Sequence, residues 1–221
     1  MKKLYGIGVG PGDAEYLTIK AYKAIKEASA IFVPDRKGES TALLIVKDYV
    51  DEKKIVPISI VMGENNDIRY SKAAKVIEET LMDGDTGVFL TLGDPMVYST
   101  FLYLMRELEK IKVNVEAIPG ISSFTAAASK VKIPIAMKGE GFYLCDGSID
   151  EEILKKCSSV AILKTYKNKK DILDTLEKYE FQYVYIKCCG RSDEKILYDK
   201  EEILEDKSYM SLLLGRRKNN D

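Results

Sequence analysis

Three glycine-containing turns mark the places where this chain could hold a small ligand. They are Gly10-Pro11-Gly12-Asp13, Gly93-Asp94-Pro95 and Pro119-Gly120-Ile121-Ser122-Ser123, and each follows an apolar run typical of a strand. Glycine lets a ligand approach the backbone closely. In open α/β sheets, ligands bind just outside the carboxyl ends of the strands. The three turns therefore indicate one ligand site.

The side chains at these turns also have purely structural interpretations. Asp94 followed by Pro95 is a favourable helix start, with the aspartate as N-cap and the proline at the first helical position. Ser122 and Ser123 could satisfy free backbone amides at a helix start, or they could bind a ligand carboxylate. Tyr98 lies beside a predicted strand end, where its ring could line a planar ligand.

The chain contains no histidine, which restricts the chemistry available to it. A Ser-His-Asp triad, a Cys-His pair, a histidine-ligated metal and a histidine general base are all excluded. The four cysteines match no zinc or redox spacing and are interpreted as small buried residues in a reducing compartment. We expect no metal site, and the sequence identifies no catalytic residue. A reaction that needs little acid–base help from the protein fits best.

The glycines near the N-terminus do not form a dinucleotide-binding motif. A Gly-x-Gly-x-x-Gly pattern beginning at Gly6 needs glycine where Pro11 stands, and one beginning at Gly8 needs glycine at Asp13. This argues against a nicotinamide-dependent oxidoreductase. The 34 basic and 35 acidic residues give a net charge of -1, without the basic excess of a dedicated nucleic-acid binder.

Length and composition indicate a globular protein. The 221 residues, 46% of them hydrophobic and 31% charged, suffice for one large or two small domains. The apolar runs are too short to span a membrane, and the first residues lack the apolar region of a signal peptide. We expect a cytoplasmic protein without membrane contact.

Strands and helices alternate along the first half of the chain. This alternation predicts an N-terminal α/β domain over residues 1–118, with a mostly parallel sheet covered by helices. Pro34 and Pro57 are expected to end two strands, and Ser40 and Asp67 to cap two helices. The predicted elements are strands 3–9, 30–33, 54–56, 87–92 and 113–118, and helices 18–28, 40–49, 67–81 and 101–108.

A second α/β domain is predicted over residues 119–221. It begins with a helix rich in small residues, 121–129, followed by a connection that contains lysine, proline and glycine. The remaining predicted elements are strands 142–144, 160–163, 183–187 and 209–214, and helices 150–157 and 170–179.

Taken together, these segments resemble the tetrapyrrole methylase family, the S-adenosylmethionine-dependent methyltransferases of corrin and sirohaem synthesis. Within it the chain is most similar to the C-20 methyltransferases of precorrin-2 or cobalt-factor II, through 5–13, 40–43 and 93–101. The blocks that match the family, in its order, are Val9-Gly10-Pro11-Gly12-Asp13, Leu92-Gly93-Asp94-Pro95, Pro119-Gly120-Ile121-Ser122-Ser123 and Tyr209-Met210-Ser211-Leu212-Leu213-Leu214.

The resemblance implies two α/β domains with a cleft between them, in which S-adenosylmethionine lies folded and is held largely by backbone contacts. It also implies a homodimer that binds a tetrapyrrole, and the near-neutral charge argues against a nucleic-acid partner. The residues carried over from the family to the cofactor pocket are Pro11, Gly93, Asp94, Val97, Ser122 and Ser123. We add Tyr98, the neighbour of Val97, to this pocket.

The implied substrate has several carboxylates on a hydrophobic ring, so it needs basic groups at the rim of its site. We assign this role to Arg36 and Lys37, although each alone is also a plausible solvated surface charge. Lys20, Lys138 and Arg191 are further candidates. The alternatives are a family member that acts at another corrin position, and a tetrapyrrole-binding protein without catalysis.

Overall fold

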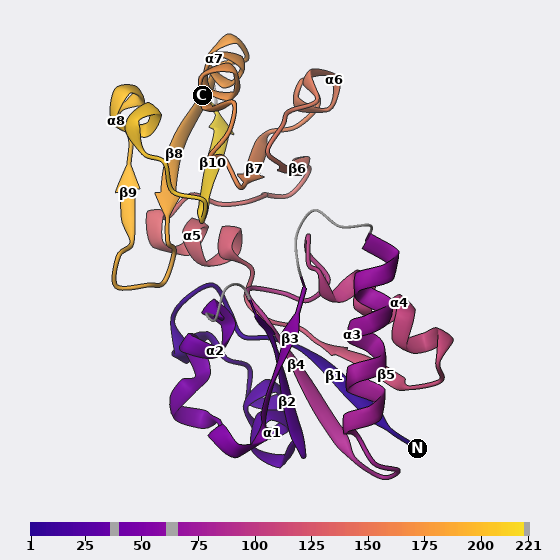
Figure 1. Cartoon of the computed structure of the whole chain (residues 1–221). Helices are drawn as coiled ribbons and strands as arrows, with labels where there is room; N and C mark the ends of the chain where they lie inside the picture. The colour runs from indigo at the N-terminus through magenta and orange to yellow at the C-terminus, as the bar shows by residue number, and fades with distance from the viewer. Residues whose placement is uncertain (36–39, 61–65, 219–221) are drawn as a thin grey trace. The chain divides into compact units, whose positions relative to one another are not determined.

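The computed structural model describes residues 1–35, 40–60 and 66–218. The chain divides into two compact units, Met1–Ser122 and Ser123–Asp221. Each unit is built on its own five-stranded sheet (Figure 1). No helix in the described parts of the chain is long and apolar enough to cross a membrane.

The sheet of the first unit is entirely parallel. Its strand order is β3-β2-β4-β1-β5, and every described pairing within it is parallel. This arrangement confirms the sheet predicted from the alternation. The strands are β1 Lys3–Gly8, β2 Ala30–Asp35, β3 Ile55–Ser59, β4 Thr86–Thr91 and β5 Asn114–Ile118.

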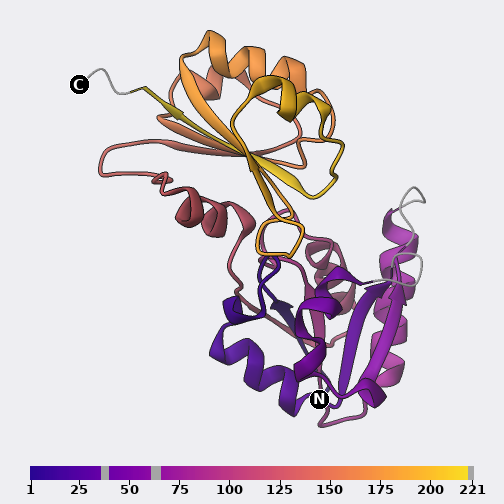
Figure 2. The ribbon, with the colours of Figure 1, turned by 90° about the vertical axis from the view of Figure 1, so that its left-hand side faces the viewer.

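Helices cover both faces of this sheet, as Figure 2 shows for α1 and α3. The helices are α1 Ile19–Glu27, α2 Thr41–Val46, α3 Asn66–Thr80 and α4 Phe101–Lys110. One hydrophobic core lies under α3 and α4, and a second lies under α1 and α2. The helix predicted over 67–81 is confirmed, and it turns one apolar stripe to the core: Tyr70, Ala73, Ala74 and Ile77 are buried, as is Leu81 just after α3.

Side-chain caps fix the starts of two of these helices. The Thr18 hydroxyl accepts a hydrogen bond from the Ala21 amide, and the Ser40 hydroxyl accepts one from the Leu43 amide. The cap predicted at Asp67 is wrong, because α3 already includes Asn66 and Asp67 lies in its first turn.

Two predicted strand ends are also wrong, because Pro34 lies within β2 and Pro57 within β3. Beyond Phe32, β2 pairs with β3 alone, and β3 is the edge strand of the sheet. Proline is tolerated at strand ends and on edge strands because fewer ladder hydrogen bonds need its missing amide.

The sheet of the second unit is mixed, with the order β6-β7-β10-β8-β9. β6 and β7 are parallel, whereas β10 runs antiparallel to both β7 and β8. The short β9 was not predicted. The strands are β6 Phe142–Asp146, β7 Ser159–Leu163, β8 Phe181–Lys187, β9 Lys195–Leu197 and β10 Ser211–Arg217.

The helices of the second unit are α5 Ser123–Val131, α6 Glu151–Leu154, α7 Lys169–Lys178 and α8 Lys200–Glu205. Residues of α6, α7 and α8 form one hydrophobic core with the sheet. Figure 2 shows α5 on the opposite side of this sheet from α7 and α8. The small residues of α5 pack closely as predicted, since Ala126, Ala127 and Ala128 are buried. Helix α8 was not predicted.

A partly buried polar network joins the end of α8 to the sheet. The Asp206 carboxylate accepts hydrogen bonds from the Tyr185 hydroxyl at 2.7 Å and the Ser208 amide at 2.8 Å, and it pairs with Lys187 at 3.1 Å. Burial alone would raise the pKa of Asp206, but these donors outweigh it and hold that pKa well below its usual range. Lys169 donates to the Ile203 carbonyl at 2.6 Å and to the Asp206 carbonyl.

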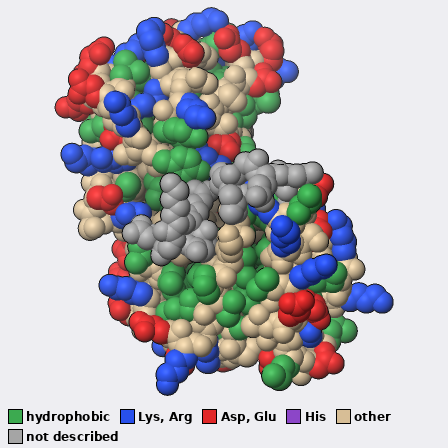
Figure 3. Space-filling model, in the orientation of Figure 1, with side chains coloured by type: hydrophobic (Ala, Val, Ile, Leu, Met, Phe, Trp, Pro, Cys, Tyr) green, Lys and Arg blue, Asp and Glu red, His purple; other side chains and the backbone are tan. Residues whose placement is uncertain are grey.

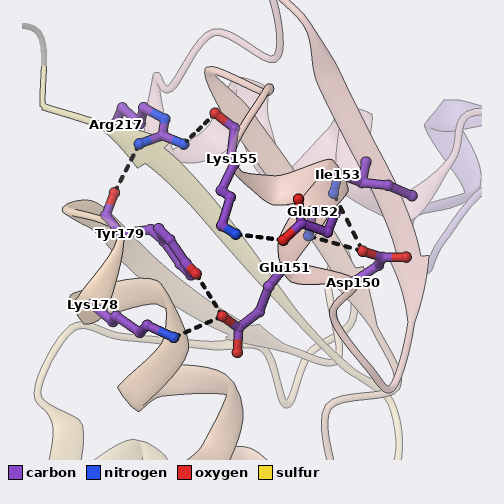
Figure 4. A network of polar contacts seen from close by, with 8 residues as sticks. All are labelled: Asp150, Glu151, Glu152, Ile153, Lys155, Lys178, Tyr179 and Arg217. Carbon is purple, nitrogen blue, oxygen red and sulfur yellow. Dashed lines mark hydrogen bonds and ion pairs between the residues drawn. The ribbon is translucent and has the colours of Figure 1, made fainter.

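Arg217 contacts the backbone near the ends of two helices, as Figure 4 shows for Lys155 and Tyr179. Its guanidinium donates to the carbonyls of Leu154, Lys155, Cys157 and Tyr179 at 2.9–3.1 Å. These carbonyls belong to the segments at the ends of α6 and α7, which lack further intrahelical donors. Arg217 therefore stabilises two helix ends at once.

Candidate functional site

The first two glycine turns contact each other through their backbones. Gly10 donates to the Gly93 carbonyl at 3.3 Å, and Gly93 donates to the Gly10 carbonyl at 2.8 Å. Both residues have left-handed backbones, with φ of 79° and 71°. Glycine adopts this conformation without the steric cost that a Cβ atom brings. The carboxyl ends of β1 and β4 are therefore joined by a glycine-dependent bridge.

The third turn reaches the same place through Gly120. A Cβ atom added to Gly8 would lie 2.5 Å from the Gly93 carbonyl oxygen and 2.6 Å from the Gly120 amide nitrogen. A Cβ atom on Gly120 would lie 2.7 Å from the Gly8 carbonyl carbon. Such distances leave no room for a side chain. The structure thus brings the three predicted turns together at the carboxyl ends of the strands of the first sheet.

Asp94 connects the second turn to the third. Its Oδ1 accepts a hydrogen bond from the Met96 amide at 2.7 Å, and its Oδ2 accepts one from the Gly120 amide at 3.0 Å. The interpretation of Asp94-Pro95 as a helix start is wrong, because α4 begins only at Phe101. The Phe101 amide donates instead to the Ser99 hydroxyl at 3.0 Å. The Asp94 carboxylate fixes the turns rather than a helix.

Open space lies above Gly93. The residue is buried, yet a Cβ atom added to it would meet no atom of the described residues within 4 Å. The backbone at this point can therefore be approached by an atom from outside the protein. This is the geometry expected where a small ligand contacts a turn directly.

The other predicted pocket residues differ in their exposure. Pro11 is buried in the first turn, and Val97 is half-buried and donates to the Asp94 carbonyl at 3.3 Å. Tyr98 is 47% exposed and has a left-handed backbone, with φ of 44°. Ser122 is half-buried and ends the first unit, whereas Ser123 is the first residue of α5 in the second. Arg36 and Lys37 lie outside the described residues.

Sequence reasoning missed two residues of this edge. Gly8 was not assigned to the site, although it makes the contact between the three turns possible. Thr91 pairs with Gly8 and is only 8% exposed, and its hydroxyl has no hydrogen-bond partner among the described residues. A threonine at the end of an otherwise apolar run, Gly87-Val88-Phe89-Leu90, was the available signal.

The cysteines are poorly suited to nucleophilic chemistry. Cys145 and Cys189 are buried, and burial raises the pKa of each thiol to about 11. A thiol with such a pKa is protonated at neutral pH and is a weak nucleophile. Cys188 and Cys189 lie just beyond β8, which ends at Lys187. Among the described residues, no group of three His, Cys, Asp or Glu could hold a metal ion.

Charge is mixed on the molecular surface. On the face shown in Figure 3, Lys and Arg side chains alternate with Asp and Glu over both units. A strongly basic stripe, the usual mark of a nucleic-acid interface, is not visible among the described residues of that face.

Comparison with known proteins identifies the family. The model of the family described as Tetrapyrrole (Corrin/Porphyrin) Methylases matches residues 3–204. The chain belongs to the tetrapyrrole methylases. The resemblance drawn from the glycine turns is thereby confirmed.

Two curated tetrapyrrole methylases show the similarity in sequence. One is a probable cobalt-precorrin-2 C(20)-methyltransferase of Methanocaldococcus jannaschii, 34% identical, with 98% of this chain and 97% of the relative covered. The other is a cobalt-precorrin-2 C(20)-methyltransferase of Salmonella typhimurium, 30% identical over 74% of this chain and 73% of the relative.

Solved structures show the same fold. A cobalt precorrin-4 methyltransferase aligns with a TM-score of 0.75 at 19% identity, covering 97% of this chain and 94% of that one. A uroporphyrin-III C-methyltransferase of Thermus thermophilus, complexed with S-adenosylhomocysteine, aligns with a TM-score of 0.74 at 20% identity, covering 97% of both chains. The predicted α/β fold of a tetrapyrrole methylase is confirmed.

Proposed function

We propose that this tetrapyrrole methylase transfers a methyl group from S-adenosylmethionine to C-20 of precorrin-2 or cobalt-factor II in cobalamin biosynthesis. The observation that supports this most is the 34% identity to a probable cobalt-precorrin-2 C(20)-methyltransferase over nearly the full length of both chains. The second C(20)-methyltransferase points to the same activity.

The glycine turns of the first unit are the proposed cofactor site. The open space above Gly93 and the fixed turns around it fit a ligand held largely by backbone contacts. Pro11, Asp94, Val97 and Tyr98 belong to the same edge, and we propose that they form the pocket together with Ser122 and Ser123. The Thermus structure, which binds the demethylated product of this cofactor, supports the assignment.

The chemistry needs positioning more than acid–base catalysis. The cofactor supplies a methyl group already activated on a sulfonium. The protein must then hold the accepting carbon in line with that methyl group, and such alignment supplies roughly 7–11 kcal/mol of the barrier reduction. A chain without histidine can do this, because rigid turns provide the alignment. The group that accepts the C-20 proton stays unassigned.

The remaining expectations belong to the same proposal. Arg36 and Lys37 are the proposed rim for the substrate carboxylates, and the homodimer, the cytoplasmic location and the absence of nucleic-acid binding stay predictions. Light scattering on the purified chain measures its oligomeric state directly.

An anaerobic incubation tests the proposed reaction. The chain is mixed with S-adenosylmethionine and either precorrin-2 or cobalt-factor II, and the products are analysed by mass spectrometry and NMR. We expect one added methyl, at C-20, on one of the two substrates. A methyl at another position would assign the chain to a different methylase of the family. Tetrapyrrole binding without methyl transfer would favour a non-catalytic binding protein.

A further inference from the structure

Left-handed backbones at residues other than glycine mark unusual positions in this chain. Among the described residues there are seven, and four of them adjoin helix ends: Lys112, Lys132, Asn168 and Glu180. Left-handed residues are common just past a helix, and asparagine tolerates the conformation elsewhere. The other three, Tyr98, Lys164 and Cys188, lie beyond the carboxyl ends of β4, β7 and β8.

The two that lie in the second unit fix the chain where β10 begins. The Lys164 amide donates to the Ser211 carbonyl at 2.9 Å, and the Cys188 amide donates to the Met210 carbonyl at 2.8 Å. The start of β10 is thus held between two strained residues. Strain of this kind persists only where the surrounding structure imposes it, and it concentrates at functional sites.

Tyr209, just before β10, forms an aromatic pair with Tyr166, which follows β7. The rings of Tyr166 and Tyr209 lie 5.0 Å apart between centroids, and the two residues are 37% and 40% exposed. Exposed aromatic pairs offer an apolar surface to a flat ligand.

Arg191 lies in the loop between β8 and β9, beside the start of β10. Its amide donates to the Cys188 carbonyl at 2.9 Å, and its Nη1 lies 3.5 Å from the Met210 sulfur. Glu194 fixes the loop by accepting from the Gly190 amide at 2.5 Å and pairing with Lys130 at 3.0 Å. The position of Arg191 therefore depends on contacts from both sides.

The guanidinium of Arg191 is held in one orientation, but only part of its hydrogen-bond donors have a partner among the described residues. Its Nε donates to Asp193 at 3.1 Å, and the side chain is 33% exposed. Within the described parts of the chain, its Nη2 donates no hydrogen bond. Arg217 differs, because its Nε, Nη1 and Nη2 all donate to backbone carbonyls. Arg191 thus combines a fixed orientation with an open donor group.

We propose that Arg191 binds a peripheral carboxylate of the tetrapyrrole substrate and thereby helps select it. The inference rests on the proposed function, which makes the substrate a flat ring edged with carboxylates. A guanidinium recognises a carboxylate through charge-assisted hydrogen bonds, and lysine does not reproduce its planar geometry. Asp193 is a positioning residue, since it contacts Nε and leaves Nη2 available.

Steady-state kinetics on four variants test this role. They are Arg191→Gln, Arg191→Lys, Asp193→Asn and the control Arg106→Gln, which changes an exposed arginine on α4 of the first unit. For Arg191→Gln we expect the KM for the tetrapyrrole to rise roughly tenfold to a hundredfold, the range for a hydrogen bond between charged groups. The value of kcat, the affinity for S-adenosylhomocysteine and the melting temperature should stay near those of the wild type.

The other variants refine the outcome. Arg191→Lys should recover only part of the loss, and Asp193→Asn should raise the KM less than Arg191→Gln does. Arg106→Gln should change none of these quantities. An unchanged KM in Arg191→Gln, or a loss that appears equally in kcat and melting temperature, would overturn the proposal.

A binding experiment separates this inference from the proposed function. If the wild-type chain methylates neither substrate, the proposed reaction fails, but Arg191 can still be tested with uroporphyrin III, a stable octacarboxylate porphyrin, by fluorescence quenching. Weaker binding by Arg191→Gln than by Arg106→Gln would support a carboxylate contact. Equal binding by both variants, or no binding by the wild type, would refute it.

Discussion

Replacing Gly93 with alanine separates the structural role of this glycine from its proposed contact with the ligand. The left-handed backbone of Gly93 makes any Cβ atom unfavourable by about 1–2 kcal/mol. In a chain of this size, that cost lowers the melting temperature by about 2–8 °C. The new methyl group itself would clash with no described atom, because the space above Gly93 is open.

Gly84 provides a matched control in the same unit. It also has a left-handed backbone, with φ of 95°, and a Cβ atom added to it would also meet no described atom within 4 Å. Gly84→Ala should therefore cost similar stability. It lies in the turn before β4, at the opposite end of that strand from Gly93.

Calorimetry with S-adenosylhomocysteine distinguishes the two variants. We expect Gly93→Ala to bind at least about tenfold more weakly than the wild type, a loss of about 1.4 kcal/mol, because the methyl group fills space that the ligand needs. Gly84→Ala should bind like the wild type. If both variants melt lower by similar amounts but bind equally well, the open space above Gly93 is not part of the cofactor site.

Four further substitutions or modifications probe other parts of the structure. Asp94→Asn can keep only one of the two hydrogen bonds to backbone amides, so we expect a loss of about 1.5–3 kcal/mol in denaturant unfolding and weaker binding of S-adenosylhomocysteine. Arg217→Ala leaves four carbonyls without this donor and should destabilise the second unit by about 1–3 kcal/mol, whereas Arg217→Lys should recover only part; a neutral Arg217→Ala would contradict this. The lowered pKa of Asp206 stabilises the fold above the unfolded value of about 3.9, so the stability lost in Asp206→Asn should be largest at neutral pH and shrink as urea melts approach pH 3. Because burial raises the pKa of Cys145 and Cys189 to about 11, iodoacetamide at pH 8 should label them far more slowly in the folded chain than in urea, as mass spectrometry will show.

Periodicity predicted most of the first unit because each of its helices buries a regular apolar stripe. The buried apolar positions of α3, continued by Leu81 just after it, recur at helical spacing, and the strands between helices are continuous apolar runs. The same rules failed at Pro34 and Pro57, because strand position decides whether a missing amide matters. Helix α8 escaped prediction because Ile203 is its only fully buried residue and the rest of the segment is charged or partly exposed.

The site was predictable in part, since glycine at a strand end is a local signal. What the sequence did not show is why these glycines are needed. The crowding at Gly8 arises from Gly93 and Gly120, which lie far away along the chain. Likewise, Asp94 has the sequence context of a helix cap, and only its contact with the Gly120 amide shows that it connects two turns. Long-range contacts of this kind have no periodic pattern in the sequence.

Lys164 and Cys188, the strained residues after β7 and β8, also show what local sequence patterns cannot predict. Neither Lys164 nor Cys188 has an intrinsic preference for a left-handed backbone, so local propensity predicts the wrong conformation at both positions. Their amides instead donate to the carbonyls of Met210, just before β10, and Ser211, the first residue of that strand, which pairs with both β7 and β8. Local preference and tertiary structure therefore disagree at the carboxyl ends of β7 and β8, close to Arg191 and the aromatic pair. Such disagreement is expected at functional positions, because there the sequence is selected for what it binds as well as for how it folds.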